Sequence, residues 1–251
     1  MASIFKNENI IMACFFTGVY DVNGNVTYAD DDIDKIKEWM DSIINLGLSG
    51  IVFHNAFSEM RVNEFENEYI KFIKVEECKG FYPSAYRYFV YRDFLQKYSS
   101  SFSNVFITDI LDVVVLKNPF IQELYLSNRN KIFCGDELMT SDCEWMRNHN
   151  AHLRKKIPDF VYYEDKFRNH TLLNAGIIGG SMILMKSLIE EMASIHEQYN
   201  YDNNINYTGD MGVVNYLLRK KYNNRLIHGD PVNTKYKFFE IERNDCWFRH
   251  K

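Results

Sequence analysis

Two aspartates three positions apart are the first residues whose spacing suggests chemistry. Asp109 and Asp112 follow an apolar segment, residues 104–108, and precede a second apolar run. Carboxylate oxygens suit Mg²⁺ and Mn²⁺, and both side chains can face one point if the chain turns between them. A cation held there would bridge two phosphates of a nucleotide and neutralise charge on the leaving group. A helix cap and a surface acid explain the pair equally well.

A phosphatase that forms an aspartyl phosphate would also place an aspartate after an apolar strand. In that chemistry the nucleophile and the acid lie two positions apart, whereas Ile110 and Leu111 separate this pair. The spacing therefore argues against that reaction.

Glycines, a histidine and a lysine later in the chain suit the binding of a charged ligand. In residues 174–176 and 179–181 the missing side chains let a ligand approach the backbone, although tight strand packing explains these glycines as well. His228 follows an apolar strand and can complete a metal shell or remain a hydrogen-bonded core residue. Lys235, on the same loop, can hold a departing diphosphate.

Two further carboxylates stand where an element begins or ends. Asp136 follows the apolar residues 131–134, and ligands of alternating strand and helix folds bind beyond the carboxyl ends of the strands. Asp210 opens a helix, so it is either a simple cap or a carboxylate that faces a sugar.

These residues must be positioned by alternating strands and helices. The periodicity predicts strands at residues 10–16, 50–54, 69–75, 104–108 and 131–134, another that ends at Met185, and a last one at residues 225–227. It predicts helices over residues 33–44 and 83–98, with Ser84 as a cap, then a helix to Tyr199 and one over residues 210–220. Residues 138–173 are polar and poorly periodic, which is typical of a substrate loop. The fold class is α/β, with a mixed, mostly parallel central sheet flanked by helices.

Composition limits the class of protein. The chain has 251 residues, enough for one large domain, and its formal net charge of −5 repels phosphate backbones, so we expect no nucleic-acid partner. Five cysteines without a C-x-x-C pair predict free thiols. The apolar run at residues 10–16 is too short for a membrane span and lacks signal-peptide flanks. The expected location is the cytoplasm, or the host cytoplasm if the protein is viral.

The order of these segments resembles the GT-A fold glycosyltransferases, which are Rossmann-like. The resemblance is strongest to small enzymes related to glycogenin and to nucleotide-sugar transferases of bacteria and large DNA viruses. The segments that carry it are Asp109 to Asp112, Asn118-Pro119-Phe120, Asn174-Ala175-Gly176, Asp210 with Asn215, and His228-Gly229 with Lys235. Two features depart from the family pattern: the first acid lies one position early, and Met211 stands where relatives often carry Gln.

The resemblance implies one glycosyltransferase domain over residues 1–251. Residues 1–116 would form its nucleotide-binding half and residues 117–251 its acceptor- and sugar-binding half. The implied reaction moves a hexosyl or deoxyhexosyl group from a nucleotide diphosphate sugar, expected to be a UDP-sugar, to a hydroxyl of a glycan or another acceptor. Alternative functions are a sugar-phosphate nucleotidyltransferase and a non-catalytic sugar-binding module.

The resemblance also implies roles for individual residues. Mn²⁺ or Mg²⁺ would be held by Asp109, Asp112 and His228, and Lys235 would stabilise the departing diphosphate. Residues that would contact the donor are Thr17, Gly18, Arg87 or Arg92, Asn174, Gly180 and Asp210. Trp145 would stack on the acceptor. If the anomeric configuration is retained, the leaving phosphate oxygen takes the acceptor's proton; if it inverts, Asp210 or Asp136 is the catalytic base.

Overall fold

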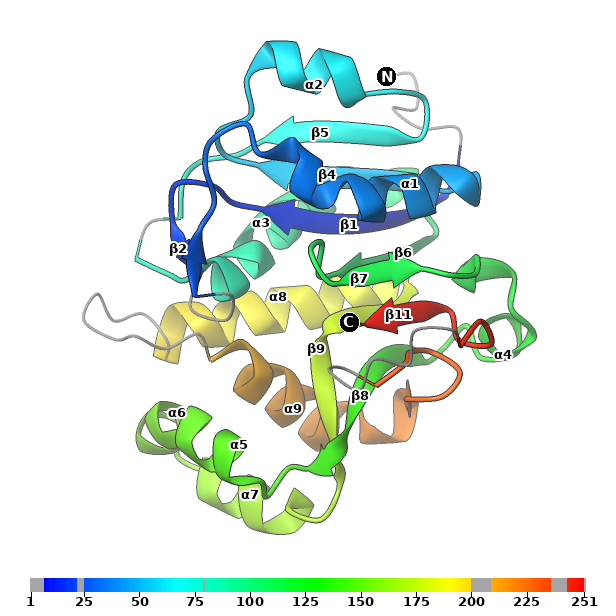
Figure 1. Cartoon of the computed structure of the whole chain (residues 1–251). Coiled ribbons are helices and arrows are strands. Elements are labelled where there is room, and N and C mark those ends of the chain that lie inside the picture. The colour runs from blue at the N-terminus through cyan, green and yellow to red at the C-terminus, as the bar shows by residue number, and fades with distance from the viewer. Residues whose placement is uncertain (1–6, 22–24, 79, 200–208, 236–242, 251) are drawn as a thin grey trace.

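A seven-stranded mixed sheet runs through the part of the chain that the structure describes, in the order β10-β8-β9-β6-β1-β4-β5 (Figure 1). This computed structural model describes residues 7–21, 25–78, 80–199, 209–235 and 243–250. The strands are β1 (Asn9–Phe15), β4 (Ser49–His54), β5 (Ile70–Lys74), β6 (Asn104–Thr108), β8 (Ile132–Thr140), β9 (Thr171–Ser181) and β10 (Leu226–His228). Strand β9 is antiparallel to β6 and β8, and the remaining pairs are parallel. The predicted α/β class with a mostly parallel sheet is confirmed.

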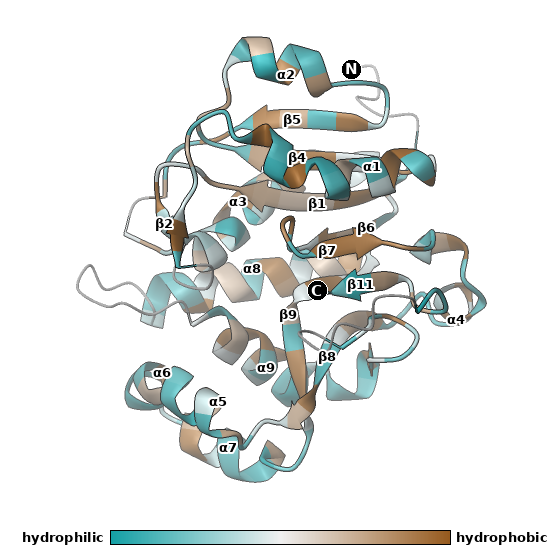
Figure 2. Cartoon of the chain, viewed as in Figure 1, coloured by the Kyte–Doolittle hydropathy of each residue, from teal (hydrophilic) through white to brown (hydrophobic). Residues whose placement is uncertain are grey.

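The central strands are apolar along their whole length because both faces of the sheet are covered. In β1, Ile10 and Met12 join the core on one face, and Ile11 and Ala13 join the core on the other. This alternation follows from the two-residue repeat of a strand. Figure 2 shows the strands as predominantly apolar and the outer sides of the helices as hydrophilic.

Helices pack on both faces of the sheet. The first core takes side chains from α3 (Pro83–Tyr98), α8 (Met182–Tyr199) and α9 (Asp210–Lys221), and the second from α1 (Lys37–Asn45). A 3-10 turn (Ile33–Ile36) precedes α1. The structure also contains the shorter helices α2 (Glu59–Phe65) and α4 (Glu123–Leu126) and two small sheets. The small sheets pair β7 (Val113–Val115) with β11 (Phe248–His250), and β2 (Tyr20–Asp21) with β3 (Val26–Thr27).

The segment predicted as a long substrate loop is helical over most of its length. It forms α5 (Glu144–His149), α6 (Ala151–Lys156) and α7 (Phe160–Phe167), which lie together at the end of the molecule away from β5 (Figure 1). Met146, Leu153 and Phe160 lie seven positions apart and are all buried in the first core. Because separate short helices supply them, no single helical period is visible in the sequence.

The apolar run that ends at Met185 is also assigned differently by the structure. Strand β9 ends at Ser181, and Met182 and Met185 belong to the buried face of α8 together with Leu188 and Ile189. Their spacing of three and four is that of a helix, so the prediction of a strand there was wrong.

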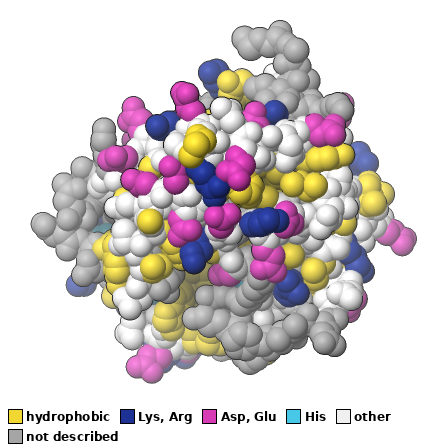
Figure 3. All heavy atoms as spheres, turned by 45° about the horizontal axis from the view of Figure 1, so that its top comes forward, with side chains coloured by type: hydrophobic (Ala, Val, Ile, Leu, Met, Phe, Trp, Pro, Cys, Tyr) yellow, Lys and Arg dark blue, Asp and Glu magenta, His cyan; other side chains and the backbone are white. Residues whose placement is uncertain are grey.

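The surface over α1 and α2 carries both signs of charge, as Figure 3 shows. Arg61 pairs with Asp34 at 2.9 Å and with Glu64 at 2.5 Å, and Arg249 pairs with Glu38 at 2.9 Å. Exposed pairs of this kind contribute little to stability. Among the described helices none has the length and apolar character needed to cross a bilayer.

Candidate active site

A cavity of about 490 Å³ lies where the chain leaves the carboxyl ends of β1 and β6. Its wall also includes parts of β8 and β9, the first turns of α3 and α9, and residues of α5 and β11. This is the edge at which ligands bind in alternating strand and helix folds. The lining includes residues that the sequence singled out, among them Arg87, Asp109, Asp112, Trp145, Asn174 and Asp210.

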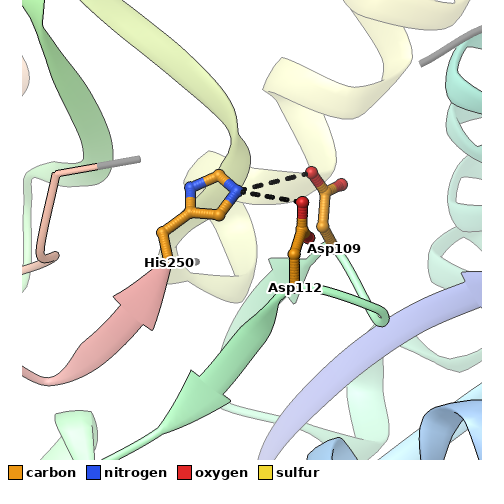
Figure 4. A group of neighbouring side chains, drawn as sticks. All are labelled: Asp109, Asp112 and His250. Atoms are coloured by element: carbon orange, nitrogen blue, oxygen red, sulfur yellow. Dashed lines mark ion pairs between the residues drawn. The ribbon is translucent and has the colours of Figure 1, made fainter. Parts of the chain in front are cut away.

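Asp109, Asp112 and His250 form a group whose three ligand atoms lie within 4.8 Å of one another (Figure 4). His250 Nε2 is 3.6 Å from Asp112 Oδ2 and 4.0 Å from Asp109 Oδ2. The two aspartates come from the turn between β6 and β7, so the chain does turn between them, as their spacing required. His250 comes from β11, at the far end of the sequence.

Strand pairing brings His250 to the aspartates. Strand β11 is antiparallel to β7, with His250 opposite Val113, the residue after Asp112. The backbone N–H of His250 donates to Thr234 Oγ1 at 2.9 Å. Burial lowers the pKa of His250, but hydrogen bonding to Asp112 and the charges of Asp112 and Asp109 raise it more, so the net shift is upward. Negatively charged carboxylates therefore surround the imidazole.

His228, the histidine predicted to complete the metal shell, is not in this group. Its Nδ1 lies 2.9 Å from Asp136 Oδ2, and its Nε2 lies 3.3 Å from a guanidinium nitrogen of Arg219. Lys235 forms an ion pair with the other oxygen of Asp136. Burial raises the pKa of Asp136, but hydrogen bonds from His228 and Lys235 lower it more, so the net shift is downward.

Asp136, His228 and Lys235 are not among the residues that line the cavity, although the sequence placed all three at the site. They form an ion-pair cluster. Lys235 of this cluster directly follows Thr234, whose hydroxyl accepts from the backbone N–H of His250. Glu137, the next residue after Asp136, lies in the cavity wall and accepts a hydrogen bond from Asn174 Nδ2 at 2.8 Å. Successive side chains of a strand point to opposite faces. Glu137 therefore reaches the cavity, whereas the neighbouring Asp136 points away from it and joins the ion-pair cluster.

Arg87 links two carboxylates of the cavity. It forms ion pairs with Asp109 and with Asp210, the latter at 3.3 Å, and it also donates to the carbonyl oxygen of Ala175. Burial raises the pKa of Asp109, the charge of Arg87 opposes that rise, and the neighbouring Asp112 adds to it. The guanidinium thus supplies the positive charge that allows several carboxylates to share one cavity.

The glycine of Asn174-Ala175-Gly176 is required by the site. A Cβ at Gly176 would lie 2.5 Å from Asp109 Oδ2 and 2.8 Å from His250 Cε1. The need for glycine at position 180 has a different cause. A Cβ there would lie 2.9 Å from the carbonyl oxygen of Lys131, and Gly180 is not among the lining residues. It therefore serves strand packing, which was the alternative explanation for these glycines.

Thr17 and Gly18 shape the turn after β1 and are not among the lining residues. The backbone N–H of Thr17 donates to Asn55 Oδ1 at 2.9 Å. Gly18 has a φ of +70° and donates its N–H to the carbonyl oxygen of Tyr28 at 2.9 Å. The neighbours that do line the cavity are the aromatic residues Phe16 and Tyr28.

Sequence reasoning missed His250, Glu137 and His149, all of which line the cavity. His149 Nε2 lies 3.8 Å from Asp210 Oδ1. The segment Phe248-Arg249-His250 has one apolar residue followed by two polar ones, so no alternation in the sequence marked it as a strand.

Comparisons with known proteins reveal similarity in structure but not in sequence. No protein-family model matches the chain, and no curated protein sequence matches it. Among solved structures, the crystal structure of galactosyltransferase LgtC in complex with donor and acceptor sugar analogs is similar. That similarity covers 96% of this chain and 86% of that one, with 13% sequence identity and a TM-score of 0.51. At this identity the similarity shows the fold, and the predicted GT-A fold is confirmed.

Proposed function

We propose that this protein transfers a sugar from a nucleotide diphosphate sugar, expected to be a UDP-sugar, to an acceptor hydroxyl, with Mn²⁺ or Mg²⁺ as its cofactor. The observation that carries this proposal is the Asp109–Asp112–His250 group, which faces a cavity at the ligand-binding edge of a GT-A fold. The GT-A fold supports a nucleotide-dependent transferase, and the group is a candidate site for the cation.

The donor set suits the cation. Two carboxylates and one imidazole are ligands that Mn²⁺ accepts readily, and carboxylates suit Mg²⁺. Two ligands that share a cation through bonds of about 2.1 Å lie roughly 3.0 to 4.2 Å apart, depending on the angle between the bonds. The two separations from His250 Nε2, 3.6 and 4.0 Å, fall within that range, and all three ligand atoms lie within 4.8 Å of one another. When bound, the cation neutralises charge on the diphosphate as it leaves.

Side chains around the group suggest how the donor is held. Phe16 and Tyr28 offer aromatic surface for the nucleotide base, and Arg87, which also lines the cavity, would face the donor's phosphates or sugar. Asn174 and Asp210 would bind hydroxyls of the transferred sugar. In this proposal residues 1–116 form the nucleotide side, residues 117–251 form the sugar and acceptor side, and His250 of the second half completes the metal group of the first.

The proton of the acceptor hydroxyl has two possible destinations. With retention of configuration, an oxygen of the leaving phosphate takes it and no protein base is needed. With inversion, Asp210 is the predicted base that lines the cavity, whereas Asp136 is engaged by His228 and Lys235. The anomeric configuration of the product, read by NMR, distinguishes the two.

Isothermal titration of UDP with and without Mn²⁺ tests the proposal. We expect UDP to bind at least about tenfold more tightly with Mn²⁺, and Asp112→Asn and His250→Ala to remove that difference. Asp165→Asn is the matched control, because Asp165 is 79% exposed on α7, and it should behave like the wild type. Equal UDP binding in the presence and absence of Mn²⁺ would show that the metal group does not serve nucleotide binding.

Turnover separates the proposed enzyme from its rivals. Release of UDP from a UDP-sugar, even by slow hydrolysis, is expected of a glycosyltransferase. Release of pyrophosphate from a nucleoside triphosphate and a sugar phosphate would instead indicate a nucleotidyltransferase. Binding of sugars without any turnover would indicate a sugar-binding module.

A further inference from the structure

One part of the cavity wall is aromatic and apolar. It is formed by Trp145 and His149 of α5 and by Met139 of β8. Trp145 is 48% exposed, although tryptophan is a residue that soluble proteins usually bury in large part. An accessible indole on the wall of a cavity is a surface that a ligand can cover.

The neighbours of Trp145 hold its ring in place. The rings of Trp145 and His149 are stacked, with centroids 4.5 Å apart and planes inclined by 22°. His149 Nε2 lies 3.8 Å from Asp210 Oδ1, and Asp210 in turn pairs with Arg87. One face of the indole therefore rests on a side chain that is connected to the carboxylates of the site. A ligand that stacks on the indole would pay little to order it.

The charges of the cavity select among acceptor classes. Among the described residues four carboxylates line it, on Asp109, Asp112, Glu137 and Asp210, against the single guanidinium of Arg87. This excess of negative charge disfavours an acidic acceptor. A neutral saccharide offers C–H groups on one face of its ring, which pack on the negative face of an aromatic ring, and hydroxyls that donate to carboxylates. A serine or threonine of a peptide offers the hydroxyl but no such face.

We propose that Trp145 is the acceptor platform of this cavity and that the acceptor is a neutral saccharide whose ring stacks on the indole. This inference rests on the proposed transferase function and adds the chemical class of the acceptor. The saccharide's hydroxyls would then lie beside His149 and close to Asp210, one of the two residues proposed to bind the transferred sugar.

Fluorescence quenching can follow Trp145 separately from the other tryptophans. Trp39 and Trp247 are only 1% and 2% exposed, so acrylamide quenching reports mainly on Trp145. The protein, saturated with UDP and Mn²⁺, is titrated with lactose, maltose and cellobiose, and in parallel with glucuronate and a serine-containing peptide. At least one neutral disaccharide should reduce quenching by about half, because stacking covers the ring. Glucuronate and the peptide should not.

The outcomes of this titration separate the acceptor platform from the proposed function. Protection by glucuronate or by the peptide, or by none of the neutral disaccharides, overturns the platform. UDP binding is measured in the same samples: if UDP binds in a Mn²⁺-dependent way and no saccharide protects, the platform alone fails. If UDP does not bind, the proposed function itself fails.

A pair of variants tests the same inference by kinetics. With a protecting saccharide as acceptor, Trp145→Ala should raise the acceptor KM by about tenfold, and Trp145→Phe should recover much of the loss. The Kd for UDP with Mn²⁺ should stay close to the wild-type value in both. Tyr162→Ala is the matched control, because Tyr162 is 70% exposed on α7 and does not line the cavity. Equal acceptor KM values for Trp145→Ala and Tyr162→Ala would overturn the assignment.

Discussion

Adding one methyl group at Gly176 should disable the metal group without unfolding the protein. The Cβ of Gly176→Ala would lie 2.5 Å from Asp109 Oδ2, the oxygen that faces His250, and 2.8 Å from His250 Cε1. Ordinary contact requires about 3.4 Å, so the carboxylate must move by roughly 1 Å, several times the tolerance of about 0.2 Å for a metal ligand. We expect the Mn²⁺-dependent part of UDP affinity to fall about 10- to 100-fold, or about 1.4 to 2.7 kcal/mol.

Gly135→Ala is the matched control for this substitution. Gly135 lies in the neighbouring strand β8, and its added Cβ would meet nothing closer than 3.5 Å, which is ordinary contact. Both variants are measured by isothermal titration of UDP with and without Mn²⁺ and by thermal unfolding. Overpacking should cost Gly176→Ala about 1 to 3 kcal/mol of folding stability, whereas Gly135→Ala should stay close to the wild type. If Gly176→Ala keeps the Mn²⁺-dependent affinity of Gly135→Ala, Asp109 and His250 do not hold a cation at the observed spacing.

Two further predictions concern stability and pH. Asp136→Asn should lower the free energy of unfolding by about 3 kcal/mol at pH 7, because it leaves Lys235 and His228 without their buried carboxylate. The folded-state pKa of Asp136 lies below the reference value of 3.8, so its contribution is complete above that value and is lost as the pH falls through the folded pKa. Urea unfolding should therefore separate the variant from the wild type at pH 7, and the difference should shrink as the pH falls below 3.8; a constant difference would contradict this. Burial lowers the pKa of His196 from 6.5 to about 4. Between these pH values the unfolded chain is protonated at His196, whereas the folded protein is not. Stability should fall by up to about 1.4 kcal/mol per unit as the pH drops from 6.5 to 4, and His196→Phe, which keeps a ring against Tyr88, should remove that part of the slope. Parallel pH profiles for the two proteins would refute the assignment.

Elements with strong local signals were predicted closely. The helix over residues 83–98 and the strand over residues 104–108 agree with α3 and β6 at both ends, because Pro83 starts the helix and a short apolar run defines the strand. The cap of that helix is Tyr82, so the prediction of Ser84 as the cap was wrong. Residues 182–185 were assigned to a strand because a short apolar run does not distinguish a buried strand from the buried side of a helix. The helices α5 to α7 were missed because each is shorter than the window in which a helical period can be recognised.

The candidate site was predictable where one turn or one strand end supplies the residues. Asp109 and Asp112 share a turn, so their spacing alone brought them together. His250 depends on the pairing of β11 with β7, which joins distant parts of the chain and leaves no local trace in the sequence. Glu137 depends on which way each side chain of β8 points, and register shifts on both sides of residues 135 and 136 keep the sequence from showing it.

The pairing of β11 with β7 also affects how the site can be lost. His250 and Asp112 are about 140 residues apart, so a cation held between them closes a very long loop. The folded sheet already holds the two ends of that loop together, so binding of the cation adds little further loss of chain entropy. Strand β11 is three residues long and can separate from β7 at a lower free energy than global unfolding requires. Such partial opening removes one ligand and leaves two. The measured affinity for the cation therefore includes the local folding equilibrium of β11, and amide hydrogen exchange in β11 should slow when the cation binds.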